Sequence, residues 1–413
     1  MLSVTEAQAI VLQHAQPLPP ETAPLSTAAL GQVLAEEVAS DLDMPPYDKA
    51  LMDGYAVRSA DLPEGRGTLE VIEEITAGKT PTLPIATLQA ARIMTGAPIP
   101  PGADAVVIIE RTRTLDNGRV QIDDKPPKPG QNILSRGREM WSGEVVLKTG
   151  TVLRPQEFGL LGSVGRTAVQ VHPRPRVAIL PTGDEVVEVS QVPGPGQIRN
   201  GNGPMLVAQT ARAGGMPRFL GIARDRLDSL RPLVAEGLRS PILVLSGGVS
   251  AGKLDLVPGV LEELGVKAHF HKIEMKPGKP LFFGTLQQKP GFSEKPGFSG
   301  SLVFGLPGNP VSGLVCFELF VRPAIRRLMG FADAGPRMVQ AVLAENFVYR
   351  TDRPTYYPAR LEAHASGWRV RPVPWFGSAD LRGVTRANAF VLFPVGDHQH
   401  RAGQIFPVLT TDD

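Results

Sequence analysis

The chain has 413 residues, of which 42% are hydrophobic and 20% charged, and its formal net charge is +2. This balance is typical of a globular protein of roughly two to four domains, and it argues against a nucleic-acid-binding chain. No apolar run reaches the ~20 residues that span a bilayer, and the N-terminus lacks the basic and apolar regions of a signal peptide. We therefore predict a cytoplasmic location without membrane contact. The single cysteine, Cys316, excludes an intramolecular disulfide and is predicted to be buried.

The first 171 residues predict a helical linker domain that is interrupted by a β-rich insertion. Ser3 and Glu6 have the spacing of a capping box that opens a helix to about Gln16, and a second helix is predicted near residues 26–38. Between residues 41 and 150, short apolar runs alternate with Pro, Gly and Asn turns, and Asp116-Asn117-Gly118 is typical of a hairpin. The predicted domains are 1–43 with 139–171, and the inserted domain 44–138.

The rest of the chain predicts an α/β domain followed by an all-β domain. Strand-like and helix-like runs alternate from 177 to 329, which indicates a doubly wound, mainly parallel sheet with helices on both faces, as domain 172–329. Residues 333–413 are strand-like again and predict a small β-barrel. The multidomain fold class is therefore α/β plus all-β modules. We assign no function to the tandem repeat within 289–300.

A polar or Gly-rich turn follows each strand-like run of the α/β domain, and ligands bind beyond the carboxyl ends of strands in such sheets. In Thr182-Gly183-Asp184-Glu185, the glycine lets the backbone approach a ligand closely, and the two carboxylates are suited to Mg²⁺. The alternative is an ordinary turn with solvated acids. Ser246-Gly247-Gly248-Val249-Ser250 can form an amide nest for an anion or be a plain turn. Asp255 either binds a metal or orients a water, or simply lies in the first turn of a helix.

Two further turns carry cations and backbone donors. Lys276-Pro277-Gly278-Lys279-Pro280 holds two ammonium groups on a stiff backbone. We interpret them as ligands for phosphate or another oxyanion, and the alternative is that both are solvated surface charges. Pro307-Gly308-Asn309-Pro310 opens a helix whose N–H groups favour an anion, and it is also an ordinary helix start. No zinc spacing, Walker motif or Ser-His-Asp arrangement is present. Together the turns predict a metal-assisted reaction of a phosphate-bearing substrate.

Six motifs that occur in order along the chain closely resemble those of the molybdopterin molybdenumtransferase family. The motifs are Met52–Arg58, Met94–Pro98, Pro181–Glu185, Ser246–Ser250, Lys276–Pro280 and Pro307–Ser312. The resemblance implies that molybdate is inserted into adenylylated molybdopterin, with hydrolytic release of AMP and with Mg²⁺ present. It also implies a homodimer of four-domain subunits, whose cleft lies between the central domain of one subunit and the β domain of the other. A molybdopterin adenylyltransferase, which resembles the central domain alone, and a non-catalytic scaffold are the alternatives.

The resemblance carries functional positions over to Asp53, Thr95, Glu185, Asp225, Asp255, Lys276, Lys279, Pro307, Pro310, Arg360 and Ser378. Residue type then assigns roles to these positions and to their neighbours in the motifs. The catalytic set is Asp53, Thr95, Glu185, Asp225 and Asp255, and the Mg²⁺ set is Asp184, Glu185, Asp225 and Asp255. The molybdate set is Lys276, Lys279, Arg360 and Ser378. The remaining substrate-binding positions are Thr182, Gly183, Ser246, Gly247, Gly248, Ser250, Pro307, Gly308, Asn309, Pro310 and Ser312.

The chain departs from the family pattern in three places. Lys49-Ala50-Leu51 precedes Met52 where the family usually has Ser-Ala, and the two other departures change the charge of a loop. Asn200 stands where the family commonly has Asp, and Arg138 stands where an acid is common. These changes alter the charge of two loops and leave the main acidic and basic sets intact. The sequence does not separate molybdate from tungstate, and it leaves open whether other enzymes of molybdenum cofactor synthesis contact this one.

Overall fold

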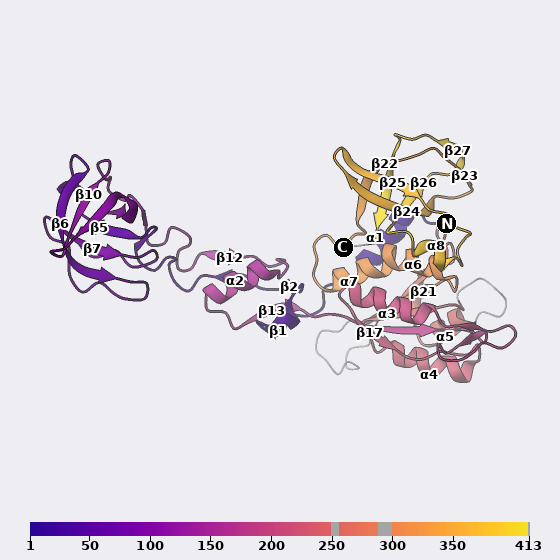
Figure 1. Cartoon of the computed structure of the whole chain (residues 1–413). Coiled ribbons are helices and arrows are strands. Elements are labelled where there is room, and N and C mark those ends of the chain that lie inside the picture. The colour runs from indigo at the N-terminus through magenta and orange to yellow at the C-terminus, as the bar shows by residue number, and fades with distance from the viewer. Residues whose placement is uncertain (249–255, 288–299, 412–413) are drawn as a thin grey trace. The chain divides into compact units, whose positions relative to one another are not determined.

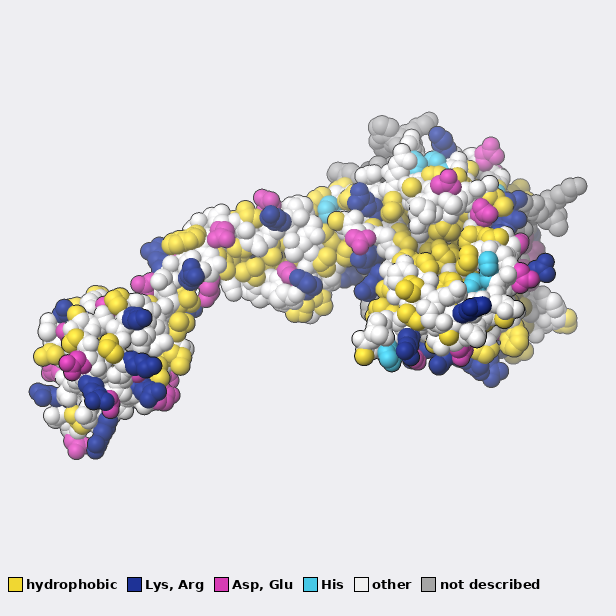
Figure 2. Space-filling model, turned by 90° about the horizontal axis from the view of Figure 1, so that it is seen from above, with side chains coloured by type: hydrophobic (Ala, Val, Ile, Leu, Met, Phe, Trp, Pro, Cys, Tyr) yellow, Lys and Arg dark blue, Asp and Glu magenta, His cyan; other side chains and the backbone are white. Residues whose placement is uncertain are grey.

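The structure, a computed structural model, describes residues 1–248, 256–287 and 300–411 (Figure 1). The chain forms two compact units. The first comprises Met1–Ala35, Gly150–Arg154 and Ala168–Asp413, and the second comprises Glu36–Thr149 and Pro155–Thr167. On the face shown in Figure 2, basic and acidic side chains are interspersed over both units. Within the described ranges, no helix combines the length and apolarity needed to cross a membrane.

The N-terminal segment confirms one predicted helix and corrects another. Helix α1 (Val4–His14) begins at Ser3, whose hydroxyl accepts from the Glu6 N–H while the Glu6 carboxylate accepts from the Ser3 N–H, so the capping box is present. The predicted helix over 26–38 is wrong. That stretch holds a 3₁₀ turn (Thr27–Ala29) and the short strands β2 (Val33–Leu34) and β3 (Val38–Ala39). Gly31, at φ +77°, turns the chain out of the helical path, and β2 pairs with β13 (Ala168–His172). Strand β1 (Glu21–Pro24) pairs with the same partner.

The second unit is β-rich, as predicted. Its six-stranded sheet has the order β8-β5-β7-β6-β10-β9. The predicted hairpin is confirmed, because Leu115 and Arg119 are cross-strand partners on either side of its turn. The six strands are β5 (Gly54–Val57), β6 (Arg66–Ile75), β7 (Gln89–Ile93), β8 (Ala105–Ile108), β9 (Thr112–Leu115) and β10 (Arg119–Asp123). The unit also holds β4 (Lys49–Ala50), β11 (Ile133–Leu134), β12 (Val145–Leu147) and helix α2 (Pro155–Ser163).

The α/β sheet has the order β17-β14-β18-β21-β20-β19 and is mainly parallel, as predicted. Strand β20 is antiparallel to both of its neighbours, so β19 runs in the same direction as β21. The turns after β14, β18, β19 and β21 therefore start at the same edge of the sheet. The strands are β14 (Arg176–Pro181), β17 (Met216–Phe219), β18 (Ile242–Ser246), β19 (Lys267–Phe270), β20 (Phe282–Gln287) and β21 (Gly300–Leu306). A short pair, β15 (Val186–Val187) with β16 (Ile198–Arg199), flanks the sheet.

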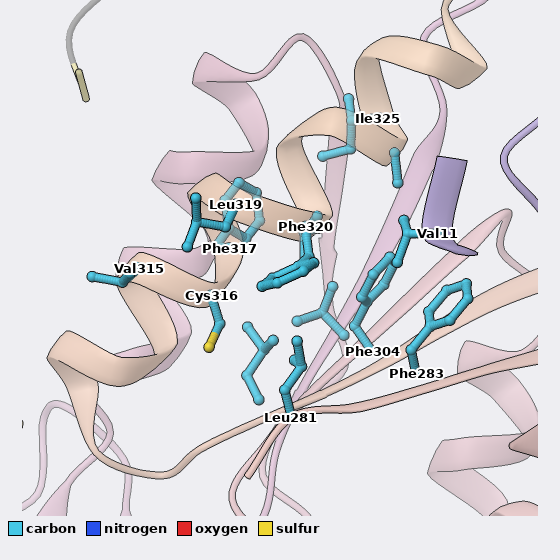
Figure 3. Close-up of a cluster of buried hydrophobic side chains, with 14 of the residues drawn as sticks. Val11, Leu281, Phe283, Phe304, Val315, Cys316, Phe317, Leu319, Phe320 and Ile325 are labelled. Atoms are coloured by element: carbon cyan, nitrogen blue, oxygen red, sulfur yellow. The ribbon is translucent and has the colours of Figure 1, made fainter. Parts of the chain in front are cut away.

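Helices cover both faces of this sheet because successive strand side chains point to opposite sides. Ile179 and Val244 belong to the core under α1, α3 (Asn202–Arg212), α6 (Pro310–Cys316) and α7 (Arg322–Leu328). Leu180 and Leu245 belong to the core under α4 (Leu227–Gly237) and α5 (Leu256–Glu263). Figure 3 shows the first core, where Cys316 lies among Phe and Leu side chains next to a π-helical turn (Phe317–Val321). Its predicted burial is confirmed, and burial raises the pKa of the thiol far above its usual range.

The C-terminal region forms the predicted barrel, and its five strands close in the order β22-β25-β24-β26-β28. The strands are β22 (Met338–Leu343), β24 (Thr355–His364), β25 (Gly367–Pro372), β26 (Ala389–Phe393) and β28 (Ile405–Thr410). The sequence did not predict the antiparallel pair β23 (Phe347–Thr351) and β27 (Gly396–His400), or the single helical turn α8 (Leu381–Val384). Strand β27 reads Gly-Asp-His-Gln-His, which has none of the apolar alternation that marks a strand.

Candidate functional site

Three of the predicted turns meet at the carboxyl edge of the α/β sheet. The Thr182 N–H donates to the Ser246 carbonyl at 2.9 Å, and the Gly247 N–H donates to the Leu306 carbonyl at 3.1 Å. A Cβ on Gly247 would lie 2.6 Å from the Thr182 carbonyl oxygen, so only glycine fits. Gly308 lies beside Gly247, since a Cβ on Gly308 would be in ordinary van der Waals contact with the Gly247 Cα at 3.6 Å. We call Thr182, Ser246, Gly247 and Gly308 the turn floor.

Asn202, which sequence reasoning did not single out, connects the turn floor. Its Nδ2 donates to the Ser246 Oγ and to the Gly308 carbonyl, each at 2.8 Å. Asn202 is the first residue of α3, and the Gly203-Pro204 pair that follows it is typical of a helix start. Asn200, the residue that departs from the family pattern, is buried and accepts from the Gly203 N–H at 2.8 Å. A neutral amide therefore opens this helix without burying a charge.

The predicted acids converge beside the turn floor. The Asp184 N–H donates to Asp225 Oδ2 at 3.3 Å, and the Asp225 N–H donates to Asp184 Oδ1 at 3.1 Å. Partial burial raises the pKa of Asp225, and the charges of Asp184 and Glu185 add to the rise, although much of the residue stays exposed. The Arg224 side chain holds the turn by donating to the carbonyls of Asp184 and Val186, each at 2.9 Å. The two acidic turns form a single negatively charged corner.

Two positions of the predicted set, Asp255 and Ser250, lie outside the described residues. Across the described ranges, no group of three or more His, Cys, Asp or Glu side chains is arranged to hold a metal ion. The tandem repeat within 289–300 also falls almost wholly outside those ranges.

A cavity of about 520 Å³ lies between the α/β domain and the C-terminal domain. The α/β side contributes the Lys276–Pro280 turn together with Met275, Asn309 and Ser312. The C-terminal side contributes Tyr349, Arg353, Tyr357, Trp375, Gly377 and Ser378. The cavity therefore unites Lys276, Lys279 and Ser378, which the sequence had assigned to one pocket. Asn309 joins the cavity to the turn floor, because it follows Gly308 directly.

The Lys276–Lys279 turn is held rigidly from both domains. The Lys276 N–H donates to the Pro354 carbonyl at 2.9 Å, and the Tyr356 N–H donates to the Lys276 carbonyl at 2.8 Å. The Lys276 ammonium lies 5.5 Å from the centroid of the Tyr349 ring, which is a cation–π distance. Between the two lysines, Gly278 has φ +114° and packs against Cys316.

Arg353 lines the cavity, whereas Arg360 does not. Arg353 is partly buried, and its Nε lies 3.3 Å from Asp352 Oδ2. Arg360 is exposed on β24, with its Nε 4.0 Å from Glu362 Oε1. Side chains alternate along a strand, and Ala359 and Leu361 point into the barrel core, so Arg360 points outward. The cation that joins the two lysines in the cavity is therefore Arg353, seven positions before the predicted Arg360.

Asp53 and Thr95 contact each other in the second unit. Asp53 Oδ1 accepts from the Thr95 Oγ1 at 2.6 Å and from its N–H at 2.7 Å. These hydrogen bonds lower the pKa of Asp53, so its carboxylate stays ionised at neutral pH. The sequence had singled out both residues but not their contact.

Three family models match successive parts of the chain. Residues 2–165 match the MoeA N-terminal region (domain I and II), residues 178–327 match a probable molybdopterin binding domain, and residues 340–411 match the MoeA C-terminal region (domain IV).

Individual proteins and solved structures agree with these models. A molybdopterin molybdenumtransferase of Staphylococcus aureus (strain MSSA476) is 32% identical over 416 residues, which cover 100% of this chain and 96% of that protein. One from Staphylococcus epidermidis is 33% identical over 93% of this chain and 90% of its own length. Two crystal structures of a molybdopterin biosynthesis MoeA protein from Pyrococcus horikoshii superpose with TM-scores of 0.82 and 0.79. The first is 31% identical and covers 100% of this chain, and the second is 29% identical and covers 99% of it. Both matches span 100% of the crystallised chain.

Proposed function

Because the chain belongs to the molybdopterin molybdenumtransferase family, we propose that it inserts molybdate into adenylylated molybdopterin and releases AMP by hydrolysis. One observation carries the proposal: a cation-lined cavity adjoins the turn floor through Asn309. A small oxyanion and a phosphate ester can therefore sit side by side. In the reaction, water attacks the adenylyl phosphorus and the bond to the molybdopterin phosphate breaks. The two dithiolene sulfurs replace two molybdate oxygens, which leave as water after taking up protons.

The cavity supplies the convergent donors that a tetrahedral dianion needs. Lys276 and Lys279 act as point charges, the Arg353 guanidinium offers a fork of N–H donors, and Ser378 offers a hydroxyl. We replace Arg360 with Arg353 in the proposed molybdate set, because Arg360 points away from the cavity. The rigid backbone around Lys276 reduces the entropy that is lost when the oxyanion binds.

The turn floor suits the phosphate ester. Glycines at two strand ends let an anion approach the backbone closely. Thr182 Oγ1 is buried and has no hydrogen-bond partner in the part of the chain that the structure describes, so it can donate to a ligand. We keep the remaining predicted positions, Gly183, Gly248, Ser250, Pro307, Pro310 and Ser312, as part of this substrate site.

The acidic corner fits Mg²⁺. Burial, and after it the charges of Asp184 and Glu185, raise the pKa of Asp225, and a bound cation would relieve the repulsion among these charges. Mg²⁺ commonly takes only one or two carboxylates, with waters and substrate phosphates completing its shell. Asp184 and Asp225, whose turns are hydrogen-bonded to each other, would supply these carboxylates, and Glu185 and Asp255 are the other predicted members of the set. Bound Mg²⁺ would neutralise charge on the phosphate that is cleaved.

Asp53 and Thr95 complete the proposed catalytic set, and the ionised Asp53 carboxylate can orient a reacting group by accepting a hydrogen bond from it. We further propose a cytoplasmic homodimer whose subunits have four domains, at 1–43 with 139–171, 44–138, 172–329 and 333–413.

The decisive test is AMP release from adenylylated molybdopterin in the presence of Mg²⁺, with and without molybdate. We expect molybdate-dependent release. ATP-dependent formation of the adenylylated pterin would indicate the adenylyltransferase instead, and no turnover at all would favour a scaffold.

A matched pair of arginine variants then tests the cavity. Arg353→Ala and Lys279→Ala should raise the molybdate concentration for half-maximal rate about tenfold or more, because each removes a charged donor worth roughly 1.5–3 kcal/mol. Arg360→Ala should stay within about twofold, since an exposed pair such as Arg360 with Glu362 contributes little. Equal effects of Arg353→Ala and Arg360→Ala would exclude the assignment.

A further inference from the structure

The cavity is much larger than the oxyanion. A tetrahedral oxyanion carries four oxygens and needs roughly 120 Å³, at about 30 Å³ for each water-sized group. The cavity holds about 520 Å³. Most of its volume is therefore available to another part of the substrate.

The additional volume borders an aromatic wall, which we define as Tyr349, Tyr357 and Trp375. The Tyr357 and Trp375 rings meet edge to face, with centroids 5.3 Å apart and an interplanar angle of 87°. Tyr349 and Tyr357 meet in the same way at 5.0 Å and 73°. Tyr357 is buried and also contacts Phe393 of the barrel core, so the wall is held in place before a ligand arrives.

Trp375 also carries a donor that lacks an acceptor. Its Nε1 is buried without a hydrogen-bond partner among the described residues. A buried indole N–H normally finds an acceptor, so this one indicates a ligand atom in the cavity. The loop that follows Trp375 is fixed, because the Asp380 carboxylate accepts from the N–H groups of Phe376 and Gly383 at 3.1 and 2.9 Å.

The chemistry of the substrate connects these observations. In molybdopterin the dithiolene that receives the metal is joined through a pyran ring to the pterin, so a pterin must lie within a few bonds of the bound oxyanion. We propose that the aromatic wall binds the pterin ring system, with Trp375 Nε1–H donating to a ring acceptor. This inference rests on the proposed function. Lys276, Lys279, Arg353 and Ser378 hold the oxyanion in the same cavity. Planar heteroaromatic rings pack well on aromatic side chains, and a pterin offers ring nitrogen and carbonyl acceptors.

Fluorescence of Trp375 tests the proposal without catalysis. The chain has three tryptophans, and Trp141 and Trp368 are exposed, so the double variant Trp141→Phe/Trp368→Phe leaves Trp375 as the only indole. The probe is unsubstituted pterin, with AMP as the competing planar ligand. We expect saturable quenching by pterin with a Kd near about 1 mM, which is ordinary for so small a molecule. We also expect AMP to quench Trp375 fluorescence less than pterin does. The quenching by pterin should persist when molybdate is present. Absent quenching by pterin, or equal quenching by AMP, would overturn the proposal.

Kinetics of the full chain supply a second measurement with a matched control. Trp375→Phe removes the N–H but keeps a ring, and should raise KM for adenylylated molybdopterin about fivefold while half-saturation by molybdate stays unchanged. Trp375→Leu should raise KM further, and Trp368→Phe, the same change at an exposed barrel position, should leave it unchanged. An equal KM for Trp375→Phe and Trp368→Phe would also overturn the proposal.

The two proposals fail separately. AMP release by the wild type without a pterin effect on Trp375 would remove the aromatic wall and leave the proposed function. Quenching by pterin without AMP release would remove the proposed function and leave a pterin-binding wall.

Discussion

Gly278→Ala should destabilise the protein at the Lys276–Pro280 turn through two separable effects. Gly278 has φ +114°, which a residue with a Cβ adopts only at a cost of about 1–3 kcal/mol. The new Cβ would also lie 2.5 Å from the Cys316 Sγ and 3.1 Å from the Met275 Cε. Overpacking of this kind costs about 1–3 kcal/mol, so we expect a total loss of about 2–6 kcal/mol in the free energy of unfolding.

Cys316→Ala separates the two effects. Alone it should cost about 1 kcal/mol, since it removes one methylene-sized atom from a buried position. In its presence the main clash of Gly278→Ala disappears, which leaves the backbone strain and the 3.1 Å contact with Met275, whose flexible side-chain end can shift at little cost. Gly367→Ala is the matched control, because Gly367 also has φ +114° but has no heavy atom within 4 Å of an added Cβ. Gly278→Ala in the Cys316→Ala background should therefore cost about as much as Gly367→Ala.

Urea unfolding followed by Trp375 fluorescence measures these energies, in the background where Trp375 is the only indole. The transition then reports the domain around the cavity, and equal slopes with urea confirm that the variants share one unfolded state. We expect a coupling of about 1–3 kcal/mol between Gly278→Ala and Cys316→Ala. Additive losses within about 0.5 kcal/mol, or equal losses for Gly278→Ala and Gly367→Ala, would refute the steric account.

Three further outcomes follow from other parts of the structure. Asn202→Ala removes two 2.8 Å hydrogen bonds that join the turn floor, so steady-state kinetics should show KM for adenylylated molybdopterin rising about tenfold with molybdate half-saturation unchanged. Burial, with the nearby His14 and Lys267, lowers the pKa of His269, so the folded state binds a proton less readily than the unfolded state. The free energy of unfolding should fall as pH drops from 6.5 toward that lower pKa, and urea unfolding of His269→Gln across this range should show a shallower fall. Mg²⁺ added with AMP should raise the melting temperature of the wild type more than that of Asp225→Asn, and equal shifts would remove Asp225 from the metal set.

The sequence predicted those features whose position follows from local chemistry or from a general rule of topology. The capping box at Ser3 and the hairpin at Asp116–Gly118 are local patterns, and both are confirmed. Parallel strands place their following turns at one sheet edge, so the contact of Thr182 with Ser246 could be expected without coordinates. The helix predicted over 26–38 failed because the pairing of β2 with β13, about 135 residues later in the chain, outweighs an apolar helical pattern.

No general rule of this kind predicts how the barrel packs against the α/β domain. That packing decides which residues line the cavity. The sequence singled out none of four residues that the C-terminal domain contributes to the cavity, Tyr349, Arg353, Tyr357 and Trp375. Nothing in the chain predicts that Lys276 exchanges backbone hydrogen bonds with Pro354 and Tyr356. Those two bonds bring the cations of both domains together.

The same contact explains why an α/β domain alone would be a different catalyst. Without the barrel, the turn floor and the Asp184–Asp225 corner remain, because their hydrogen bonds all lie within the α/β domain. Arg353, Ser378 and the aromatic wall are lost, and the Lys276 turn loses its two partners. Such a domain could still hold a nucleotide ester, but it would lack the cation-lined cavity for an oxyanion. On the proposed function, the added barrel is therefore what turns a phosphate-handling crevice into one that can also insert a metal oxyanion.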